Sequence, residues 1–314
     1  MSRRGWLLFT VMCVVWGIPY LLIKVAVEQV SPAEVVFART SLAALVLIPL
    51  ALRARAVRPA LRAWRPLLLF AALEMAGPWY LLAHAEQDLS SSLTGLLVAA
   101  VPLVSAVVAR GLGESDRLDR GRVIGLGVGL AGVAVLLGVD VRGDLLAVGA
   151  VGVTVLGYAT APLLITRSLA RVPAVGVNAV ALSCAALLYL PFGAPGLISD
   201  PPTGRAALAL VGLGLICTAL ALVLFFRLIA EVGSQRALVI TFVNPAVAVV
   251  LGITLLDEPF TVGTAIGFPL VLLGCALATR RNRAITVGRP QSAGEPALAV
   301  PDTGGRDAAA ALDR

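Results

Sequence analysis

The chain has 314 residues, of which 59% are hydrophobic and 14% are charged, and its mean hydropathy is +0.95. Soluble globular proteins are about 45–50% apolar and about 25% charged, so this chain has too few charged side chains to cover its apolar surface in water. The net charge of +7 comes with 5% aromatic residues and without interleaved basic and aromatic side chains, so we expect no nucleic acid as a partner. The composition predicts an integral membrane protein.

A helix needs about 20 apolar residues to cross the hydrocarbon core of a bilayer. Ten segments, separated by short polar or Pro- and Gly-containing turns, meet this requirement. In chain order they are residues 5–25, 33–52, 66–86, 91–110, 121–139, 145–167, 174–193, 206–227, 235–255 and 262–280. The sequence therefore predicts an all-α integral membrane protein with ten transmembrane helices. Residues 284–314 are polar and rich in Pro, Gly and Ala, and we expect a disordered cytoplasmic tail there.

Basic residues predict the orientation, because cytoplasmic loops are enriched in Lys and Arg. Arginines precede the first span, follow spans two, four, six and eight, and recur in the tail. The loops on the opposite side contain Arg142 and Arg205. This alternation predicts a multi-pass protein of the cytoplasmic (plasma) membrane with both termini in the cytoplasm.

Several features recur along the chain at a nearly constant spacing. They are Ile124-Gly125 and Ile266-Gly267, 142 residues apart, Pro102 and Pro245, 143 apart, and Glu114 and Glu258, 144 apart. This spacing predicts two five-helix repeats, residues 1–140 and 143–283. Because five is odd, the second repeat must enter the membrane in the opposite direction. Inverted repeats of this kind are typical of secondary transporters, whose solute site lies near the midplane between the halves.

These features resemble the EamA-type members of the drug/metabolite transporter superfamily. The resemblance rests on Trp16-Gly17, Lys24, Arg39, Pro102, Pro245, Glu114, Glu258 and the two Ile-Gly stretches at Ile124 and Ile266. It covers residues 5–280 and implies two EamA repeats around a central cavity, with export or exchange of amino acids or related metabolites. The second half has Gly157-Tyr158 where the first has Trp16-Gly17, and it matches neither Lys24 nor Arg39, so we expect an asymmetric cavity.

Two charged residues within spans are the first candidates for function, because a charge inside a membrane is costly. Glu74 lies near the middle of the third span, and a carboxyl group out of water takes up a proton more readily. We therefore expect Glu74 to couple protons and to contact the substrate, with a permanently paired structural carboxyl as the alternative. Arg39, in the second span, is predicted to bind a solute carboxylate. Alternatively, it pairs with Glu34, Glu86 or Glu74, or it reaches toward lipid headgroups.

Other polar and aromatic side chains within the spans are candidates for the substrate-binding cavity. They are Trp16, Tyr20, Trp79, Tyr158, Asn178 and Asn244. The alternative for the aromatic residues is an interfacial belt. Pro102 and Pro245 are predicted helix breaks, because proline removes a backbone donor and frees carbonyl groups that can face a cavity.

Some charged residues near the ends of spans are predicted to have no role in the cavity. Lys24 lies near the outer end of the first span, where we expect its side chain to snorkel toward water. The predicted rim residues are Glu28, Glu86 and Asp88.

The sequence argues against a metal site, a cofactor and catalysis. The four cysteines lie in apolar stretches without a CxxC pair, and His84 is the single histidine, so we expect no metal and no cofactor. The expected function is alternating-access transport of a small molecule, with membrane lipid as the other partner. The alternatives are a membrane-embedded enzyme and a non-transporting scaffold or sensor. The substrate, the direction of transport and the oligomeric state stay open.

Overall fold

The computed structural model describes residues 2–111, 120–140, 145–233, 237 and 239–278, and all regular elements within these ranges are helices. Residues Met1–Arg280 form one compact unit. Glu114, Arg142 and the predicted tail lie outside the described residues.

The part of the chain before residue 141 contains nine α-helices and one π-helical segment in its described residues. In order they are α1 (Arg3–Gly17), α2 (Pro19–Ala26), α3 (Pro32–Arg53), α4 (Val57–Arg62), α5 (Trp64–Ala71), η1 (Ala72–Ala76), α6 (Gly77–Asp88), α7 (Ser91–Val98), α8 (Val101–Gly111) and α9 (Arg120–Asp140).

The described residues after position 144 form further long apolar helices and a second π-helical segment. They are α10 (Leu145–Ser168), α11 (Ala174–Ser199), α12 (Gly204–Val211), η2 (Gly212–Leu220), α13 (Ala221–Val232), α15 (Ile240–Leu255) and α16 (Val262–Ala278).

Seven helical stretches of the described chain are long and apolar enough to cross a membrane. They are Arg3–Ala26, Pro32–Arg53, Trp64–Asp88, Ser91–Val108, Leu145–Ser168, Ala174–Ser199 and Gly204–Val232. Three shorter apolar helices are Val123–Leu136, Ile240–Leu255 and Val262–Leu277. The fold is therefore that of a multi-pass, all-helical membrane protein.

Local sequence explains where several elements begin or are interrupted. Helix α3 begins after Ser31, whose hydroxyl accepts a hydrogen bond from the amide of Glu34, while the Glu34 carboxylate accepts one from the amide of Ser31. This reciprocal pair is a capping box. The first predicted span is interrupted at Ile18, just before Pro19, and the fourth is interrupted between α7 and α8.

Small residues allow several helices to pack closely. A Cβ atom added to Gly132 of α9 would lie 2.8 Å from the carbonyl oxygen of Gly267 in α16. A Cβ atom on Gly193 of α11 would lie 2.8 Å from the carbonyl oxygen of Ala33 in α3. Membrane helices commonly use glycine for such backbone approach. In contrast, Gly127 has no neighbour within 4 Å, so it does not serve this purpose.

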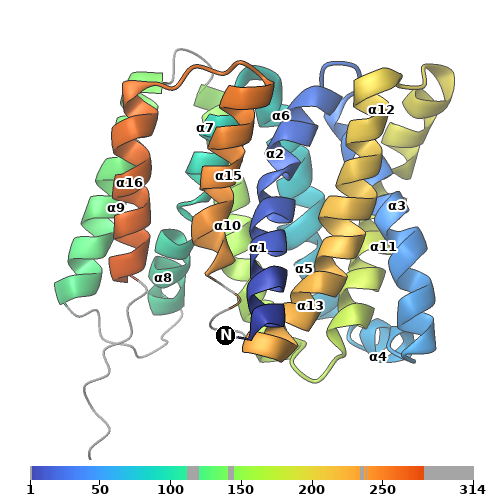
Figure 1. Cartoon of the computed structure of the whole chain (residues 1–314). Helices are drawn as coiled ribbons and strands as arrows, with labels where there is room; N and C mark the ends of the chain where they lie inside the picture. The colour runs from blue at the N-terminus through green and yellow to red at the C-terminus, as the bar shows by residue number, and fades with distance from the viewer. Residues whose placement is uncertain (1, 112–119, 141–144, 234–236, 238, 279–314) are drawn as a thin grey trace, which may run out of the picture. The chain divides into compact units, whose positions relative to one another are not determined.

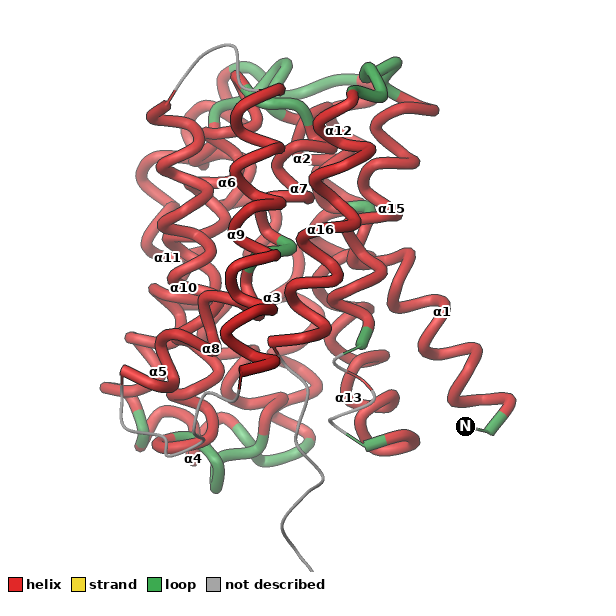
Figure 2. Tube along the Cα trace, turned by 90° about the vertical axis from the view of Figure 1, so that its left-hand side faces the viewer, coloured by secondary structure: helices red, strands yellow, loops and turns green. Residues whose placement is uncertain are grey.

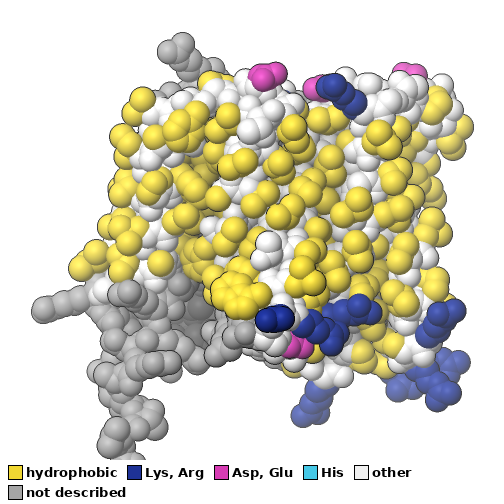
Figure 3. Space-filling model, viewed as in Figure 1, with side chains coloured by type: hydrophobic (Ala, Val, Ile, Leu, Met, Phe, Trp, Pro, Cys, Tyr) yellow, Lys and Arg dark blue, Asp and Glu magenta, His cyan; other side chains and the backbone are white. Residues whose placement is uncertain are grey.

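The helices run side by side in the compact unit (Figures 1 and 2). Helix α3 packs on α11 and η2, α10 packs on α6, α7 packs on α15, and α9 packs on α16. Apolar side chains cover the face of the molecule shown in Figure 3, with most Lys and Arg side chains at the end near α4. Such a continuous apolar surface fits a lipid environment.

Candidate functional site

A buried arginine lies at the centre of the candidate site. Arg39 is 7% exposed and lies two helical turns after the start of α3. Its Nε–H donates to the Oγ1 atom of Thr218 at 2.9 Å, and its Cζ atom lies 3.7 Å from the centroid of the Trp79 ring. Within the described part of the chain, no carboxylate forms an ion pair with Arg39. The structure therefore does not contain the predicted alternative pairs with Glu34, Glu86 or Glu74.

One π-helical segment lies beside this arginine, and a second one directly precedes the helix that carries Trp79. Thr218 belongs to η2, and its hydroxyl donates to the carbonyl oxygen of Leu213, five residues earlier, at 2.7 Å. Because its proton is used in this bond, the Oγ1 atom of Thr218 can accept the hydrogen bond from Arg39. Trp79 stands just after η1, at the start of α6. Short π-helical segments inside α-helices frequently occur at functional sites.

Two tyrosines lie within electrostatic range of Arg39. Tyr158 of α10 and Tyr20 of α2 are both partly buried, and both interact electrostatically with Arg39. Tyr158 also approaches the side chain of Trp79. The ring of Tyr20 lies against α7 at Gly95, where an added Cβ atom would be 3.4 Å from its Cδ2 atom. The structure thus brings together four predicted residues, Tyr20, Arg39, Trp79 and Tyr158.

Glu74 lies at the edge of this group. It belongs to η1, is partly buried, and interacts electrostatically with Tyr158. No described residue forms a hydrogen bond or an ion pair with its carboxyl group. The predicted permanently paired carboxyl is therefore absent from the described residues, and the proton-coupling role of Glu74 stays a prediction.

Glu86 does not lie at the rim, where the sequence placed it. Its side chain is 0% exposed, and neither carboxyl oxygen has a hydrogen-bond partner among the described residues. The backbone N–H of Lys24 in α2 lies near the Glu86 carboxyl group. Its geometry is not that of a hydrogen bond to either carboxyl oxygen. Helix α6 continues two residues beyond Glu86 and packs on α2, so this residue is not at the free end of the helix.

Lys24 is partly exposed, and its ammonium group binds backbone carbonyl groups that the sequence did not predict as its partners. Its ammonium group donates to the carbonyl oxygens of Glu86 at 2.6 Å and Leu89 at 2.9 Å, and it lies 3.5 Å from that of Gln87. The last carbonyl groups of a helix lack partners within the helix and carry partial negative charge. Lys24 therefore caps the C-terminus of α6 and ties it to α2.

A second tie, meaning a polar contact that joins two helical segments, lies beside the one made by Lys24. The carboxylate of Glu258 accepts hydrogen bonds from the amides of Ser91 at 2.7 Å and Ser92 at 2.9 Å, at the N-terminus of α7. A Cβ atom on Gly252 would overlap the Glu258 carboxylate and the Ser92 hydroxyl, so glycine provides the space for this contact. Asp257 adopts a positive φ of 53° in the turn that carries Glu258.

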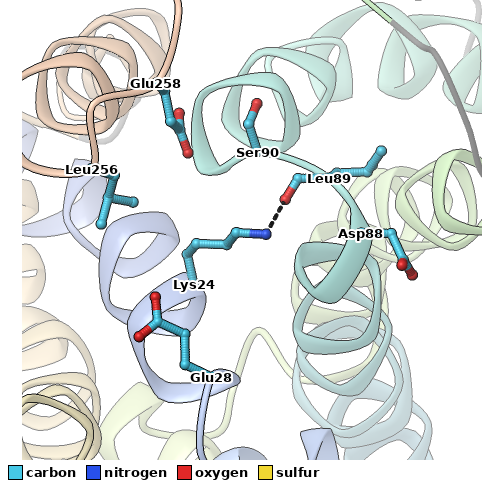
Figure 4. Close-up of a pocket in the computed structure, with 7 residues that line it drawn as sticks. All are labelled: Lys24, Glu28, Asp88, Leu89, Ser90, Leu256 and Glu258. Atoms are coloured by element: carbon cyan, nitrogen blue, oxygen red, sulfur yellow. Dashed lines mark hydrogen bonds between the residues drawn. The ribbon is translucent and has the colours of Figure 1, made fainter.

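A pocket of about 240 Å³ opens between these ties. Its lining residues are Lys24, Glu28, Asp88, Leu89, Ser90, Leu256 and Glu258. Figure 4 shows Lys24 extending across the pocket to the carbonyl group of Leu89, while Asp88 points away from it. Four of the seven side chains are ionisable, so the pocket can hold water.

Three of the predicted substrate-binding residues make contacts that do not involve Arg39. The ring of Trp16 packs on Phe225 of α13, with 4.6 Å between the centroids. The side-chain amide of Asn178 donates to Ala174 in its own helix at 2.9 Å. With its nitrogen facing two carbonyl groups, the amide of Asn244 donates to Ile240 at 2.9 Å and to Cys13 of α1 at 3.1 Å.

The two predicted helix breaks differ in their surroundings. Pro102 is the second residue of α8, directly after the interruption that separates α7 from α8. Pro245 lies inside α15, which runs through it from Ile240 to Leu255.

Sequence reasoning did not identify Thr218, the burial of Glu86 or the contacts of Lys24. Thr218 is a hydroxyl-bearing residue in a long apolar segment, which is a signal that could have pointed to it. Lys24 and Glu86 lie near the ends of predicted spans, where exposure is the ordinary expectation. Their burial depends on the approach of α2 to α6, which no local pattern predicts.

The arrangement around Arg39 suits an organic anion. A guanidinium group stays charged and matches a carboxylate with paired N–H donors. The Nε–H of Arg39 is bonded to Thr218, which orients the group, while the Trp79 ring covers one face. In the described residues, no three His, Cys, Asp or Glu side chains are grouped to hold a metal ion.

Comparisons with known proteins concern the family and the fold. The sequence model of the EamA-like transporter family matches residues 3–138 and 142–280. The uncharacterized transporter YvbV of Bacillus subtilis (strain 168) is 26% identical over 293 residues, which cover 90% of this chain and 94% of YvbV. Among the similar solved structures is a crystal structure with a TM-score of 0.60 and 22% identity, covering 89% of this chain and 97% of that chain. At this identity, the likeness to the solved structure concerns the fold alone.

Proposed function

Because the chain belongs to the EamA-like transporter family, we propose that it is a secondary carrier that moves small carboxylate-bearing metabolites, such as amino acids, by alternating access. Export or exchange is the direction that the family resemblance favours. The site of binding is the group formed by Arg39, Trp79, Thr218, Tyr20 and Tyr158.

One observation carries this proposal: Arg39 is buried without an acidic partner in the described part of the chain. A buried charge without an opposite charge is costly, and the cost usually reaches several kcal/mol. A solute carboxylate would supply the missing negative charge. The contacts with Thr218 and Trp79 hold the guanidinium group in place before the solute arrives, which reduces the entropy cost of binding.

The carrier architecture that we propose has ten transmembrane helices in two inverted repeats, residues 1–140 and 143–283. The two stretches that match the family support this division. The π-helical segments η1 and η2 support it independently, because their first residues, Ala72 and Gly212, are 140 positions apart. The three shorter apolar helices would complete the seven longer ones as spans.

The proposed orientation places both termini in the cytoplasm and the pocket near Lys24 at the outer end. The basic residues around α4 support this, because Arg53, Arg55, Arg58 and Arg62 are all exposed. The acidic residues Glu28 and Asp88 are exposed near the pocket. In this conformation the ties made by Lys24 and Glu258 join three segments at the outer end, as expected for a state closed on that side.

The test is counterflow in proteoliposomes with a panel of labelled amino acids, each compared with its amide, which lacks the carboxylate. We expect the wild-type protein to exchange acids but not their amides. Arg39→Gln should abolish this exchange, because an amide side chain cannot pair with a carboxylate. Arg205→Gln, which alters an exposed arginine, is the matched control and should exchange normally.

Two results would contradict the proposal. If the wild-type protein moved no member of the panel, the carrier function for this solute class would be wrong. If the Arg39→Gln and Arg205→Gln variants exchanged acids at the same rate, the solute carboxylate would bind elsewhere than at Arg39.

A further inference from the structure

We propose that Glu86 is the carboxyl group that exchanges a proton during transport, and that Lys24 neutralises its charge after the proton has left. The inference rests on the proposed carrier function and adds a driving ion to it. It moves the proton site from Glu74, where the sequence placed it, to a residue two turns beyond Trp79 on the same helix.

The first argument is the enclosure of Glu86. Its side chain has no exposed surface, and both carboxyl oxygens lack a hydrogen-bond donor among the described residues. An ionised carboxylate at such a position loses its hydration without replacement, which costs several kcal/mol or more. The neutral, protonated carboxyl group is therefore the form that fits this conformation. Glu74 is not enclosed in this way, because part of its side chain is accessible.

The second argument is the position of Lys24. Its ammonium group binds the backbone carbonyl of Glu86 and interacts electrostatically with the Glu86 side chain, but it does not form an ion pair with that side chain in the described structure. Its present acceptors are carbonyl groups at the end of α6 and beyond it. When the α2–α6 contact opens, the long lysine side chain can exchange these carbonyl groups for the carboxylate. Lys24 thus has two alternative sets of acceptors.

The third argument is the route to water. Lys24 also lines the 240 Å³ pocket, so the same side chain interacts with the buried carboxyl and faces the pocket. Release of Lys24 from the carbonyl of Leu89 would open a path from the pocket to the carboxyl of Glu86. The O–H bond of Glu86 would then break, its proton would pass to water in the pocket, and the remaining carboxylate would pair with the ammonium group.

The ionisable groups that interact electrostatically with Glu86 come from three segments. Lys24 and Tyr20 belong to α2, Arg39 belongs to α3, and Glu258 lies between α15 and α16. Lys24 and Arg39 favour the ionised form of Glu86, whereas the charge of Glu258 disfavours it. Glu258 itself accepts hydrogen bonds from two amides at the N-terminus of α7. The charge of Glu86 is therefore coupled to the groups that close the outer end.

Glu86 is also linked to the solute site. Trp79 and Glu86 are seven residues apart in α6, so they share one face of the helix. Arg39 contacts the first and interacts electrostatically with the second. A solute carboxylate at Arg39 would neutralise that cation and so favour the protonated form of Glu86. Conversely, loss of the proton would leave Arg39 with a negative neighbour, which would weaken the binding of an anionic solute.

The experiment combines two measurements on full-length protein. The first is the infrared band of the protonated carboxyl group in purified protein at neutral pH, which does not depend on transport. The second is solute-driven proton movement in proteoliposomes that contain a pH-sensitive dye, measured beside counterflow. The variants are Glu86→Gln, which is close in shape and neutral, Glu86→Asp, which keeps a carboxyl group, and Glu74→Gln as the matched control.

We expect Glu86→Gln to lose part of the infrared band and all solute-driven proton movement, while counterflow persists because a neutral side chain replaces a neutral carboxyl. Glu86→Asp should keep the band and the proton movement, and Glu74→Gln should keep proton movement. An unchanged band in Glu86→Gln would overturn the proposal, since the carboxyl would then be ionised in the wild-type protein. Proton movement that survives in Glu86→Gln, or disappears in Glu74→Gln alone, would also overturn it.

The two proposals can fail separately. If the wild-type protein moved no solute, the proton exchange would fall together with the carrier function. The infrared comparison would still show whether Glu86 holds a proton in the closed conformation. If solute moved without proton movement in the wild-type protein, the carrier function would stand and the role of Glu86 would be wrong.

Discussion

The Cζ atom of Arg39 lies 3.7 Å from the centroid of the Trp79 ring, so the indole covers one face of a buried guanidinium group. The cation is thereby stabilised, and no carboxylate of the described residues competes for its N–H donors. An acidic partner would stabilise Arg39 as well, but it would occupy the donors that a solute needs. The aromatic contact is therefore compatible with a site that stays ready to bind an anion.

The first prediction concerns this contact. Trp79→Leu should raise the half-saturating concentration of solute in counterflow, because a cation–π contact contributes about 0.5–2 kcal/mol, or about 2- to 30-fold in affinity. Trp79→Phe keeps an aromatic ring and should show a smaller increase. Equal effects of the two substitutions would mean that ring volume, rather than the cation–π contact, is what Trp79 contributes.

Thr218 gives the second prediction. Thr218→Val preserves the shape of the side chain but removes the acceptor for the Nε–H of Arg39, and leaving a buried donor unpaired costs about 1–3 kcal/mol. We expect a lower unfolding temperature in detergent and weaker solute exchange. Thr218→Ser retains the hydroxyl and should keep most of both. A Thr218→Val variant with normal exchange would show that this bond does not orient Arg39 for binding.

The class of fold could be predicted from the sequence, whereas the composition of the site could be predicted in part. Long apolar segments predict membrane helices because lipid leaves a backbone few alternatives. Charged residues such as Arg39 stand out against them. The contacts of Arg39 could not be predicted, because Thr218 lies 179 positions away and reaches it through a π-helical segment.

The end of a predicted span was the least informative position. Lys24 and Glu86 were expected to be exposed, since charged residues at span ends usually reach water. The structure places them against each other because α2 and α6 meet there, with α6 ending in carbonyl groups that attract a cation. Asn178 and Asn244 show the reverse case, in which a polar residue within a span bonds to backbone carbonyl groups.

Glycine at position 252 gives the third prediction. Gly252→Ala should lower the unfolding temperature, because the added methyl group overlaps the carboxylate of Glu258 and disturbs the cap of α7. Gly149→Ala is the matched control, since Gly149 lies in α10 with no neighbour within 4 Å. It should be neutral or stabilising by up to about 1 kcal/mol, as expected for alanine in a helix. Equal unfolding temperatures in the two variants would contradict the proposed role of Gly252.

The tie made by Lys24 gives the fourth prediction. Lys24→Met removes the cation from the end of α6 and should let α2 and α6 separate more often. We expect faster reaction of a Ser90→Cys variant with a thiol reagent when it also carries Lys24→Met, because Ser90 lines the pocket. Lys24→Arg keeps a cation and should leave the rate nearly unchanged. An equal rate in all three backgrounds would show that Lys24 does not hold this end closed.

The proposed orientation gives the last prediction, which concerns the two ends of the molecule. Glu28 and Arg58 are both exposed, one near the pocket and the other in α4. In intact cells, a thiol reagent that does not cross membranes should modify a Glu28→Cys variant, because Glu28 would face outward. It should modify an Arg58→Cys variant only after the membrane has been permeabilised, because arginine-rich loops stay in the cytoplasm. The unaltered chain is the control for its four native cysteines. The reverse labelling pattern would invert the orientation and would place the Lys24 pocket, and with it the proton exit from Glu86, on the cytoplasmic side.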